Sequence, residues 1–404
     1  MVLKFKHILV ASTVAATSVS ATAQAGTAAP MQAGLQDQQL MATAQVFSEG
    51  DQLKFQSKAL GEERSLLVYK PESYKKNKDA TYPVIYLLDG PSHFDHTIAA
   101  MKYMVKEDRM PEAIIVGIPN LPSTRRRDML DKPINFTKFI KSEVMPHIEG
   151  NYRTNDQKTL FGHSLAGRFA LFFMSEHKDI FQNYIAGSPA LQGDDFIDVK
   201  MLVKNLKAND EGAPTVYFAV GQGERAGFIG SVDTFKKALE GGIAPDMKWK
   251  AEYIPTLDHS MSPYVSAYRG LQYVYSDYSD PVFASVAEYE KAGEMSAIEA
   301  HYKNRAVKYG LEDKIPQTAI IAVANLYAGE GKHKKAVEIF EYNQRANPES
   351  LRANFNLARG YQAAGMHEKS VEYFQISLEL DAKSGGRNKT LMMNMLEQAK
   401  ARVK

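Results

Sequence analysis

The stretch Thr159–Gly167 reads TLFGHSLAG and carries a strong fold signal. It differs from the pattern G-x-S-x-G by one methyl group, because Ala166 stands at the second glycine position. In that pattern a serine occupies a sharp turn between a strand and a helix, and its near neighbours are small because the two elements cross closely. We therefore expect a strand over Lys158–Phe161, a helix over Leu165–Met174 and a nucleophilic Ser164 between them. The alternative is that Ser164 only caps the helix.

Strand-like and helical segments alternate on both sides of this turn. Several of the strand-like segments are continuous apolar runs, which is typical of strands buried on both faces of a parallel sheet. The pattern predicts an α/β fold with a doubly wound, mostly parallel sheet. The strand-like segments are Arg64–Pro71, Tyr82–Gly90, Ala113–Asn120, Gln157–Ser164, Asn183–Ala190, Pro214–Gly223 and Lys248–Leu257, and the clearest helical ones are Asn135–Glu149 and Ser231–Leu239.

Two histidines follow Ser164 before the chain becomes wholly helical, and only one is well placed to act as its base. His177 lies near the end of the helix that Ser164 would begin, so we expect it to point away from the turn. His259 follows the last predicted strand, in TLDHSM. A triad on this kind of sheet runs serine, acid, histidine along the chain, which predicts His259 as the general base.

The acid of such a triad has three candidates. Glu224 follows the predicted strand before that of His259, in AVGQGERAG, and is the favoured one. Asp233 and Asp258 remain alternatives. The segment Gly221–Ala226 also fits G-x-G-x-x-A, but it follows at least five strands instead of opening the first unit, so we expect no dinucleotide and no other cofactor.

An oxyanion formed at Ser164 needs two N–H donors. One is the amide of Leu165, directly after the serine. The other is expected in the loop after the strand that ends LLDGPSHF. Pro91 has no N–H, so the donor there is Gly90 or Ser92.

Two further polar clusters follow predicted strands. The segment NLPSTRRRDML places Arg125, Arg126 and Arg127 where ligands bind such sheets, and Arg127 is the favoured contact for an anionic substrate. The alternative is a solvated surface loop. The segment SHFDH contains possible metal ligands, but their spacing is loose, and we expect no metal site.

The C-terminal part, residues 282–404, is helix only and contains a repeat. Residues recur 34 positions apart, as when Ala324, Tyr327, Gly331 and Phe340 return as Ala358, Tyr361, Gly365 and Phe374. The same offset relates His333, Lys335, Val337 and Glu338 to His367, Lys369, Val371 and Glu372. This is the tetratricopeptide signature. Two units cannot bury a core alone, so we expect this part to pack on the α/β domain (residues 45–281) or on a second subunit.

The N-terminus has the pattern of a cleavable signal peptide over residues 1–25. Lys4 and Lys6 precede an apolar run that ends at Ala23-Gln24-Ala25. Residues 26–44 are expected to form a flexible leader, so the protein is expected to be exported, to the periplasm or beyond the cell. The net charge of +2 gives no reason to expect nucleic acid, and the chain has no cysteine and no later segment apolar enough to span a membrane.

Five motifs in order resemble the putative-esterase branch of the α/β-hydrolases, which includes the enterochelin esterases and is related to S-formylglutathione hydrolases. They are YPVIYLLDG, FIKSEVMPHIEGNYRT, GHSLAG, AGSPAL and DHSM. The resemblance covers about Val46 to Tyr278 and implies ester hydrolysis through Ser164 and His259. A siderophore ester, a carbohydrate acyl ester and a small acyl ester stay open as substrates. So do acyl transfer and a non-catalytic scaffold that binds partners or a second copy through the helical tail. This sequence departs from the family at Ala166, at Pro91 and in SPAL.

Overall fold

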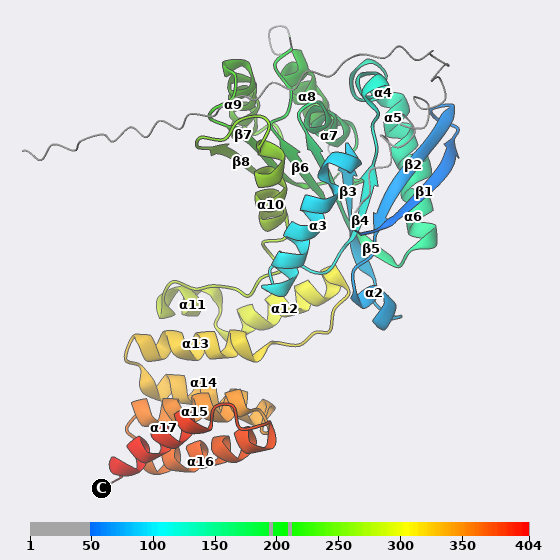
Figure 1. Cartoon of the computed structure of the whole chain (residues 1–404). Helices are drawn as coiled ribbons and strands as arrows, with labels where there is room; N and C mark the ends of the chain where they lie inside the picture. The colour runs from blue at the N-terminus through cyan, green and yellow to red at the C-terminus, as the bar shows by residue number, and fades with distance from the viewer. Residues whose placement is uncertain (1–48, 194–196, 209–211, 404) are drawn as a thin grey trace, which may run out of the picture. The chain divides into compact units, whose positions relative to one another are not determined.

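The computed structural model describes residues 49–193, 197–208 and 212–403 (Figure 1). The predicted signal peptide (residues 1–25) and leader (26–44) lie outside the described residues. Within the described ranges, no helix combines the length and the apolar character needed to cross a membrane.

A single eight-stranded sheet forms the centre of the α/β part, in the order β1-β2-β4-β3-β5-β6-β7-β8. Strands β3 to β8 pair in parallel, whereas β2 is antiparallel to both β1 and β4. The predicted α/β fold with a mostly parallel sheet is confirmed. The strands are β1 (Asp51–Ser57), β2 (Glu62–Tyr69), β3 (Tyr82–Leu88), β4 (Ile114–Ile118), β5 (Thr154–His163), β6 (Asn183–Gly187), β7 (Thr215–Gly221) and β8 (Lys248–Ile254).

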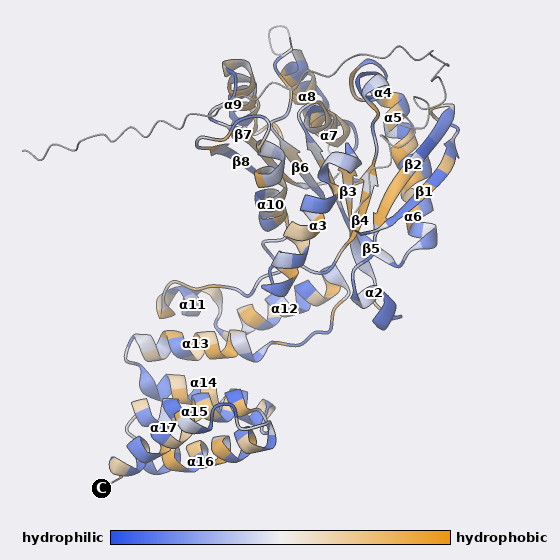
Figure 2. Ribbon diagram, viewed as in Figure 1, coloured by the Kyte–Doolittle hydropathy of each residue, from blue (hydrophilic) through white to orange (hydrophobic). Residues whose placement is uncertain are grey.

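Helices cover both faces of the sheet. On β3, Val84 and Tyr86 belong to a core with α7 (Leu165–Glu176), while Ile85 faces the opposite core with α3 (Gly90–Lys106) and α10 (Ser262–Val274). Burial on both faces explains the continuous apolar runs, and Figure 2 shows such a run along β4. The remaining helices of this part are α2 (Ser73–Lys76), α4 (Pro122–Arg126), η1 (Arg127–Asp131), α5 (Pro133–Phe139), η2 (Ile140–Val144), α6 (Met145–Asn151), α8 (Ile197–Ala208) and α9 (Ala226–Glu240), with η marking π-helical turns.

The described residues of the C-terminal part form helices joined by loops, and the helices repeat with the sequence. Helices α13 and α15 begin 34 residues apart, at Gln317 and Leu351, and α14 and α16 begin at His333 and His367. A glycine with positive φ separates the two helices of each repeat: Gly331 lies between α13 and α14, and Gly365 lies between α15 and α16. The helices are α11 (Val286–Ala292), α12 (Met295–Tyr309), α13 (Gln317–Gly329), α14 (His333–Ala346), α15 (Leu351–Ala363), α16 (His367–Lys383) and α17 (Lys389–Ala401).

Helix α12 contacts the α/β part directly. The ring of Tyr309 is 1% exposed and lies in the same core as Tyr275 and Tyr278. Its hydroxyl donates to Asp277 Oδ1 at 2.7 Å, and Arg305 donates to the carbonyl of Tyr278 at 3.0 Å. Of the helical part, α12 packs on the α/β domain in this way, whereas residues of α13 to α17 belong to two further hydrophobic clusters.

Candidate active site

Ser164 lies at the turn between β5 and α7 in a strained backbone conformation, with φ 58° and ψ −120°. A Cβ on Gly162 would lie 2.2 Å from the carbonyl oxygen of Ala166, so only glycine fits at that position. The methyl group of Ala166 itself is fully buried and accommodated. The hydroxyl of Ser164 makes no capping hydrogen bond to α7, so the alternative in which Ser164 only caps the helix is not supported. Strained backbone conformations of this kind are found mostly at functional sites, where the surrounding structure holds the residue in place.

His259 follows β8 and brings its imidazole to Ser164. Its Nε2 lies 3.0 Å from Ser164 Oγ, and its Nδ1 lies 2.7 Å from Glu224 Oε2. The ring packs against Phe228, with ring centres 4.7 Å apart. His177 instead lies at the end of α7, near Lys141 Nζ.

Glu224 is the acid that reaches His259. Its side chain is 1% exposed, and its Oε1 accepts hydrogen bonds from the Gly221 amide at 3.0 Å and from the Ser188 hydroxyl. Burial raises the pKa of Glu224, but hydrogen bonds from His259, Ser188 and Gly221 outweigh it and hold the pKa below its usual value. The carboxylate is therefore ionised at neutral pH.

The two other acid candidates bind elsewhere. Asp258 accepts hydrogen bonds from Ser260 and from the amide of Met261, and Asp233 accepts one from the hydroxyl of Tyr253. Chain order alone left three acids open, and the side-chain contacts single out Glu224.

The loop expected to complete an oxyanion site begins α3. The amide of Ser92 donates to the carbonyl of Asp89 at 2.9 Å, so the prediction of Ser92 as an oxyanion donor is wrong. Gly90 is the first residue of α3 and Leu165 the first of α7, positions at which a helix leaves its N–H groups without an intrahelical partner. A Cβ on Gly90 would lie 2.7 Å from the backbone of Gly117, which accounts for glycine there.

Arg125, rather than Arg127, reaches this region. Its guanidinium holds Asp89 with three contacts of 2.8 to 2.9 Å and donates to the carbonyl of His163 at 3.4 Å. Asp89 has φ 51°, and burial raises its pKa while Arg125 opposes that rise. Arg125 thus ties the loop after β3 to the turn that carries Ser164.

Arg127 is committed to another network. Its guanidinium binds Glu62 at 2.7 and 3.0 Å and Asp128 at 2.7 and 2.8 Å, and Asp128 also pairs with the buried Arg64. The predicted substrate contact at Arg127 is therefore not supported by its position. Three consecutive arginines gave no signal to separate them, since the direction of each side chain depends on the short α4 and η1 turns.

The histidines of α3 lie close to one another without forming a metal cluster. His93 Nδ1 is 3.1 Å from His96 Nε2, and burial lowers the pKa of both to about 4. Among the residues that the structure describes, no group of three or more acidic or histidine side chains is arranged to hold a metal ion. His93 packs its ring near that of His163, next to Ser164.

Comparison with known proteins gives a consistent family. The putative esterase family matches residues 57–267, more than half of the 404 residues. Ferri-bacillibactin esterase BesA of Bacillus subtilis is 35% identical over 144 residues, which are 28% of this chain and 49% of that protein. This chain therefore spans about half the length of that relative.

Solved structures extend the likeness of the fold. The BES protein from Bacillus cereus superposes with a TM-score of 0.51 at 27% identity, covering 57% of this chain and 95% of that one. An uncharacterised protein from Capnocytophaga ochracea superposes with a TM-score of 0.59 at 17% identity, covering 87% of this chain and 100% of that one. The second likeness concerns the fold alone, and it extends over most of the chain.

Proposed function

We propose that this chain, which belongs to the putative esterase family, hydrolyses carboxylic esters with Ser164 as nucleophile, His259 as general base and Glu224 as the acid that orients the histidine. One observation carries the proposal. Hydrogen bonds run without a break from Ser164 Oγ to His259 Nε2, at 3.0 Å, and from His259 Nδ1 to Glu224 Oε2, at 2.7 Å. The three residues follow three different strands, so their contacts do not arise from the conformation of one turn or helix.

The arrangement supplies each proton transfer that ester hydrolysis requires. His259 takes the proton of Ser164 as its oxygen attacks the ester carbonyl, and then gives that proton to the leaving alcohol. A water molecule, activated by the same imidazole, next attacks the acyl-enzyme and releases the acid. The ionised Glu224 fixes the His259 tautomer and stabilises the imidazolium. No cofactor is needed for these steps.

The tetrahedral intermediate carries negative charge on the former carbonyl oxygen. The amides of Leu165 and Gly90, at the N-termini of α7 and α3, are the donors we assign to it. The ion pair of Arg125 with Asp89 holds the loop of Gly90 next to the Ser164 turn.

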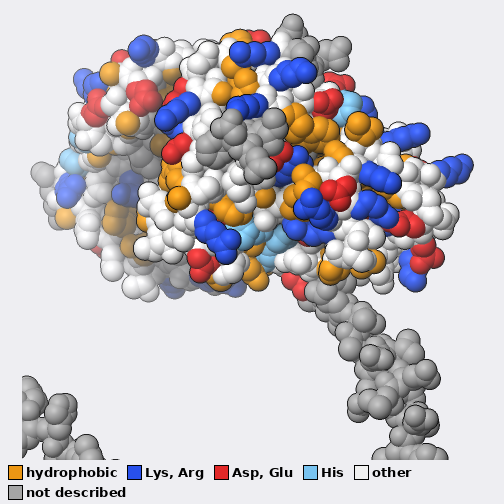
Figure 3. All heavy atoms as spheres, turned by 90° about the horizontal axis from the view of Figure 1, so that it is seen from above, with side chains coloured by type: hydrophobic (Ala, Val, Ile, Leu, Met, Phe, Trp, Pro, Cys, Tyr) orange, Lys and Arg blue, Asp and Glu red, His pale blue; other side chains and the backbone are white. Residues whose placement is uncertain are grey.

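The substrate we favour is a siderophore-type ester. BesA, which shares 35% identity over the matched region, is named a ferri-bacillibactin esterase. Exposed apolar side chains neighbour the site in the chain or in space, among them Met261, two residues after His259, and Tyr264, whose ring lies 4.3 Å from that of His96. Figure 3, which views the molecule from above relative to Figure 1, shows histidines between hydrophobic and basic side chains. Such a surface suits an aromatic, anionic ester.

Two features outside the α/β part belong to the same proposal. The 34-residue spacing of the helix pairs supports a tetratricopeptide-like assignment for the C-terminal part. Residues 1–25 have two lysines near their start, continue with an apolar run and end with Ala-Gln-Ala. This order supports export of the protein with cleavage of a signal peptide.

The test is Ser164→Ala, measured with p-nitrophenyl acetate and with a fluorophosphonate probe. We expect turnover to fall by on the order of 10⁵-fold or more and labelling to disappear, with unchanged thermal unfolding. Ser260→Ala is the matched control, because it removes a hydroxyl one residue from His259 that binds only Asp258. Undiminished turnover in Ser164→Ala would exclude the proposal. A panel of ferric and iron-free catecholate esters, feruloyl esters and short acyl esters then ranks the substrates.

A further inference from the structure

Behind Glu224 the hydrogen-bond chain continues through three more side chains. Ser188 directly follows β6, Ser262 is the first residue of α10, and His163 is the last residue of β5, next to Ser164. The two serines are 0% and 1% exposed. All three lie at the same edge of the sheet as the site, although they are 25 to 99 residues apart in the sequence.

Ser188 is the member of this cluster that contacts Glu224. It donates its single hydroxyl proton to Glu224 Oε1, because the carboxylate is an acceptor only. Its Oγ also lies 2.9 Å from Ser262 Oγ. The hydroxyl of Ser262 donates to the carbonyl of His259 at 3.1 Å, and its Oγ lies 2.8 Å from His163 Nε2. Ser262 therefore contacts Ser188, His163 and the backbone of His259.

His163 lies at the far end of this cluster as a neutral imidazole. Burial lowers its pKa to about 3, and the neighbouring His259, His93 and Arg125 act in the same direction. His163 Nε2 faces Ser262 Oγ at 2.8 Å. The ring of His163 also packs against that of His259, with centres 4.7 Å apart.

The backbone at Ser188 is held in an unusual conformation for this contact. Its φ is 40°, which is uncommon for a residue other than glycine. Its amide donates to the carbonyl of Ala219 on β7 at 2.7 Å, and two residues later the amide of Ala190 donates to the carbonyl of Ser164 at 3.0 Å. The loop after β6 is thereby fixed to both β7 and the Ser164 turn, with the Ser188 hydroxyl aimed at Glu224.

We infer that Ser188 is a positioning residue, which holds the Glu224 carboxylate in the orientation that His259 needs, with Ser262 and His163 packed behind it. The inference rests on the proposed function, since it assigns Ser188 an effect through Glu224. Ser188 does not touch Ser164 or the ester in this scheme.

The test is Ser188→Ala, which removes the hydroxyl and keeps the rest of the residue. We expect kcat to fall about 10-fold and KM to change less than about 2-fold, because one charge-assisted hydrogen bond to the acid is lost and no substrate contact changes. Ser175→Ala is the matched control. It also deletes a fully buried serine hydroxyl, one that donates to the carbonyl of Phe172, on the far end of α7, and it is expected to keep wild-type kcat.

A double-mutant cycle separates positioning from a merely structural role. In a Glu224→Gln background, adding Ser188→Ala is expected to change kcat less than about 2-fold, since the carboxylate through which Ser188 acts is gone. If the second substitution still costs 10-fold there, Ser188 does not act through Glu224 and the inference is wrong.

Failure of the inference can be told from failure of the proposed function. A wild-type protein that neither reacts with fluorophosphonate nor cleaves esters refutes the proposed function. A wild-type protein that does both, with an undiminished kcat in Ser188→Ala, refutes only the role of Ser188. Should Ser188→Ala not fold, Ser262→Ala removes the hydroxyl that contacts Ser188, and a fall in kcat of about 3-fold that vanishes in the Glu224→Gln background is expected. An additive effect there overturns the inference equally.

Discussion

At the carboxyl edge of the sheet, Glu224 accepts hydrogen bonds from His259, Ser188 and the Gly221 amide, and at the amino edge Asp277 accepts them from Tyr309 and Lys308. Hydrogen bonds also hold the pKa of Asp277 below its usual value against the effect of burial. Both edges therefore contain an ionised carboxylate held by nearby donors.

The difference lies in what the donor can do. Burial, and then the charge of Asp277, raise the pKa of Tyr309 well above its usual value, so this phenol keeps its proton and serves as an anchor for α12. At the other edge the donor is an imidazole with Ser164 on its second nitrogen. An imidazole can accept a proton near neutral pH, and a hydroxyl can supply one. The comparison indicates that a carboxylate held by donors belongs to a reactive site only when a base and a nucleophile continue the chain of contacts.

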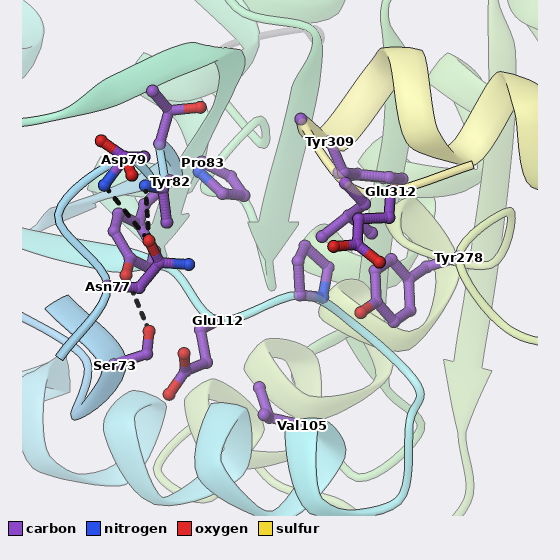
Figure 4. A pocket seen from close by; sticks show the side chains of 15 residues that line it. Ser73, Asn77, Asp79, Tyr82, Pro83, Val105, Glu112, Tyr278, Tyr309 and Glu312 are labelled. Atoms are coloured by element: carbon purple, nitrogen blue, oxygen red, sulfur yellow. Dashed lines mark hydrogen bonds between the residues drawn. The ribbon is translucent and has the colours of Figure 1, made fainter. Parts of the chain in front are cut away.

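A prominent cavity lies at the amino edge of the sheet, away from Ser164, His259 and Glu224. A cavity of about 540 Å³ lies at the amino edge, between the start of β3 and the end of α12 (Figure 4). Tyr278 and Tyr309 line it together with Ser73, Glu112 and Glu312. Ser164, His259 and Glu224 are absent from its lining. Its lining combines residues at the start of β3 with Tyr309 at the end of α12 and the residues that follow it.

The largest effect that would sharpen this comparison is expected at the acid of the carboxyl edge. Glu224→Gln keeps the shape of the side chain and removes its charge, so the imidazolium formed at His259 loses its stabilisation. We expect kcat for p-nitrophenyl acetate to fall by on the order of 10³- to 10⁴-fold, with fluorophosphonate labelling slowed in proportion. Asp258→Asn, which alters an exposed acid bonded to Ser260, serves as the control. A Glu224→Gln enzyme with near-normal kcat would mean that His259 needs no acid, and the two edges would then differ less than the contacts indicate.

A smaller effect is expected from substitutions of Arg125 and Arg127. Arg125→Met leaves Asp89 buried without its partner and frees the loop of Gly90, so kcat is expected to fall about 10- to 100-fold. Arg127→Met breaks the ion pairs with Glu62 and Asp128, and is expected to lower the unfolding temperature while kcat stays within about 2-fold. Steady-state kinetics and thermal unfolding of both variants check this. The reverse pattern, with Arg127 controlling kcat, would restore the substrate contact that the sequence suggested.

These contacts also show what the sequence could and could not predict. The sequence could predict that Ser164, His259 and Glu224 lie together, because strand ends and chain order place them at one edge of a parallel sheet. Strand β1 was not predicted, because its segment DQLKFQS alternates between apolar and polar residues, lies at the edge of the sheet and has no apolar run. Ser92 was misassigned because α3 begins as early as Gly90, which commits its amide. A single serine such as Ser188 carries no pattern at all, and only the fold brings it to Glu224.

The smallest effect is expected at the amino edge, where Tyr309→Phe removes one hydroxyl that donates to Asp277. The free energy of unfolding is expected to fall by about 1 kcal/mol, since one hydrogen bond to a charged acceptor is lost while the ring stays packed on Tyr278. Ester turnover is expected to remain unchanged, because the substitution lies at the opposite end of β5 from Ser164. Chemical denaturation and steady-state kinetics on the same preparation measure both quantities. A fall in kcat beyond about 3-fold would show that the α12 anchor communicates with the carboxyl edge, and the two edges could then no longer be treated as independent.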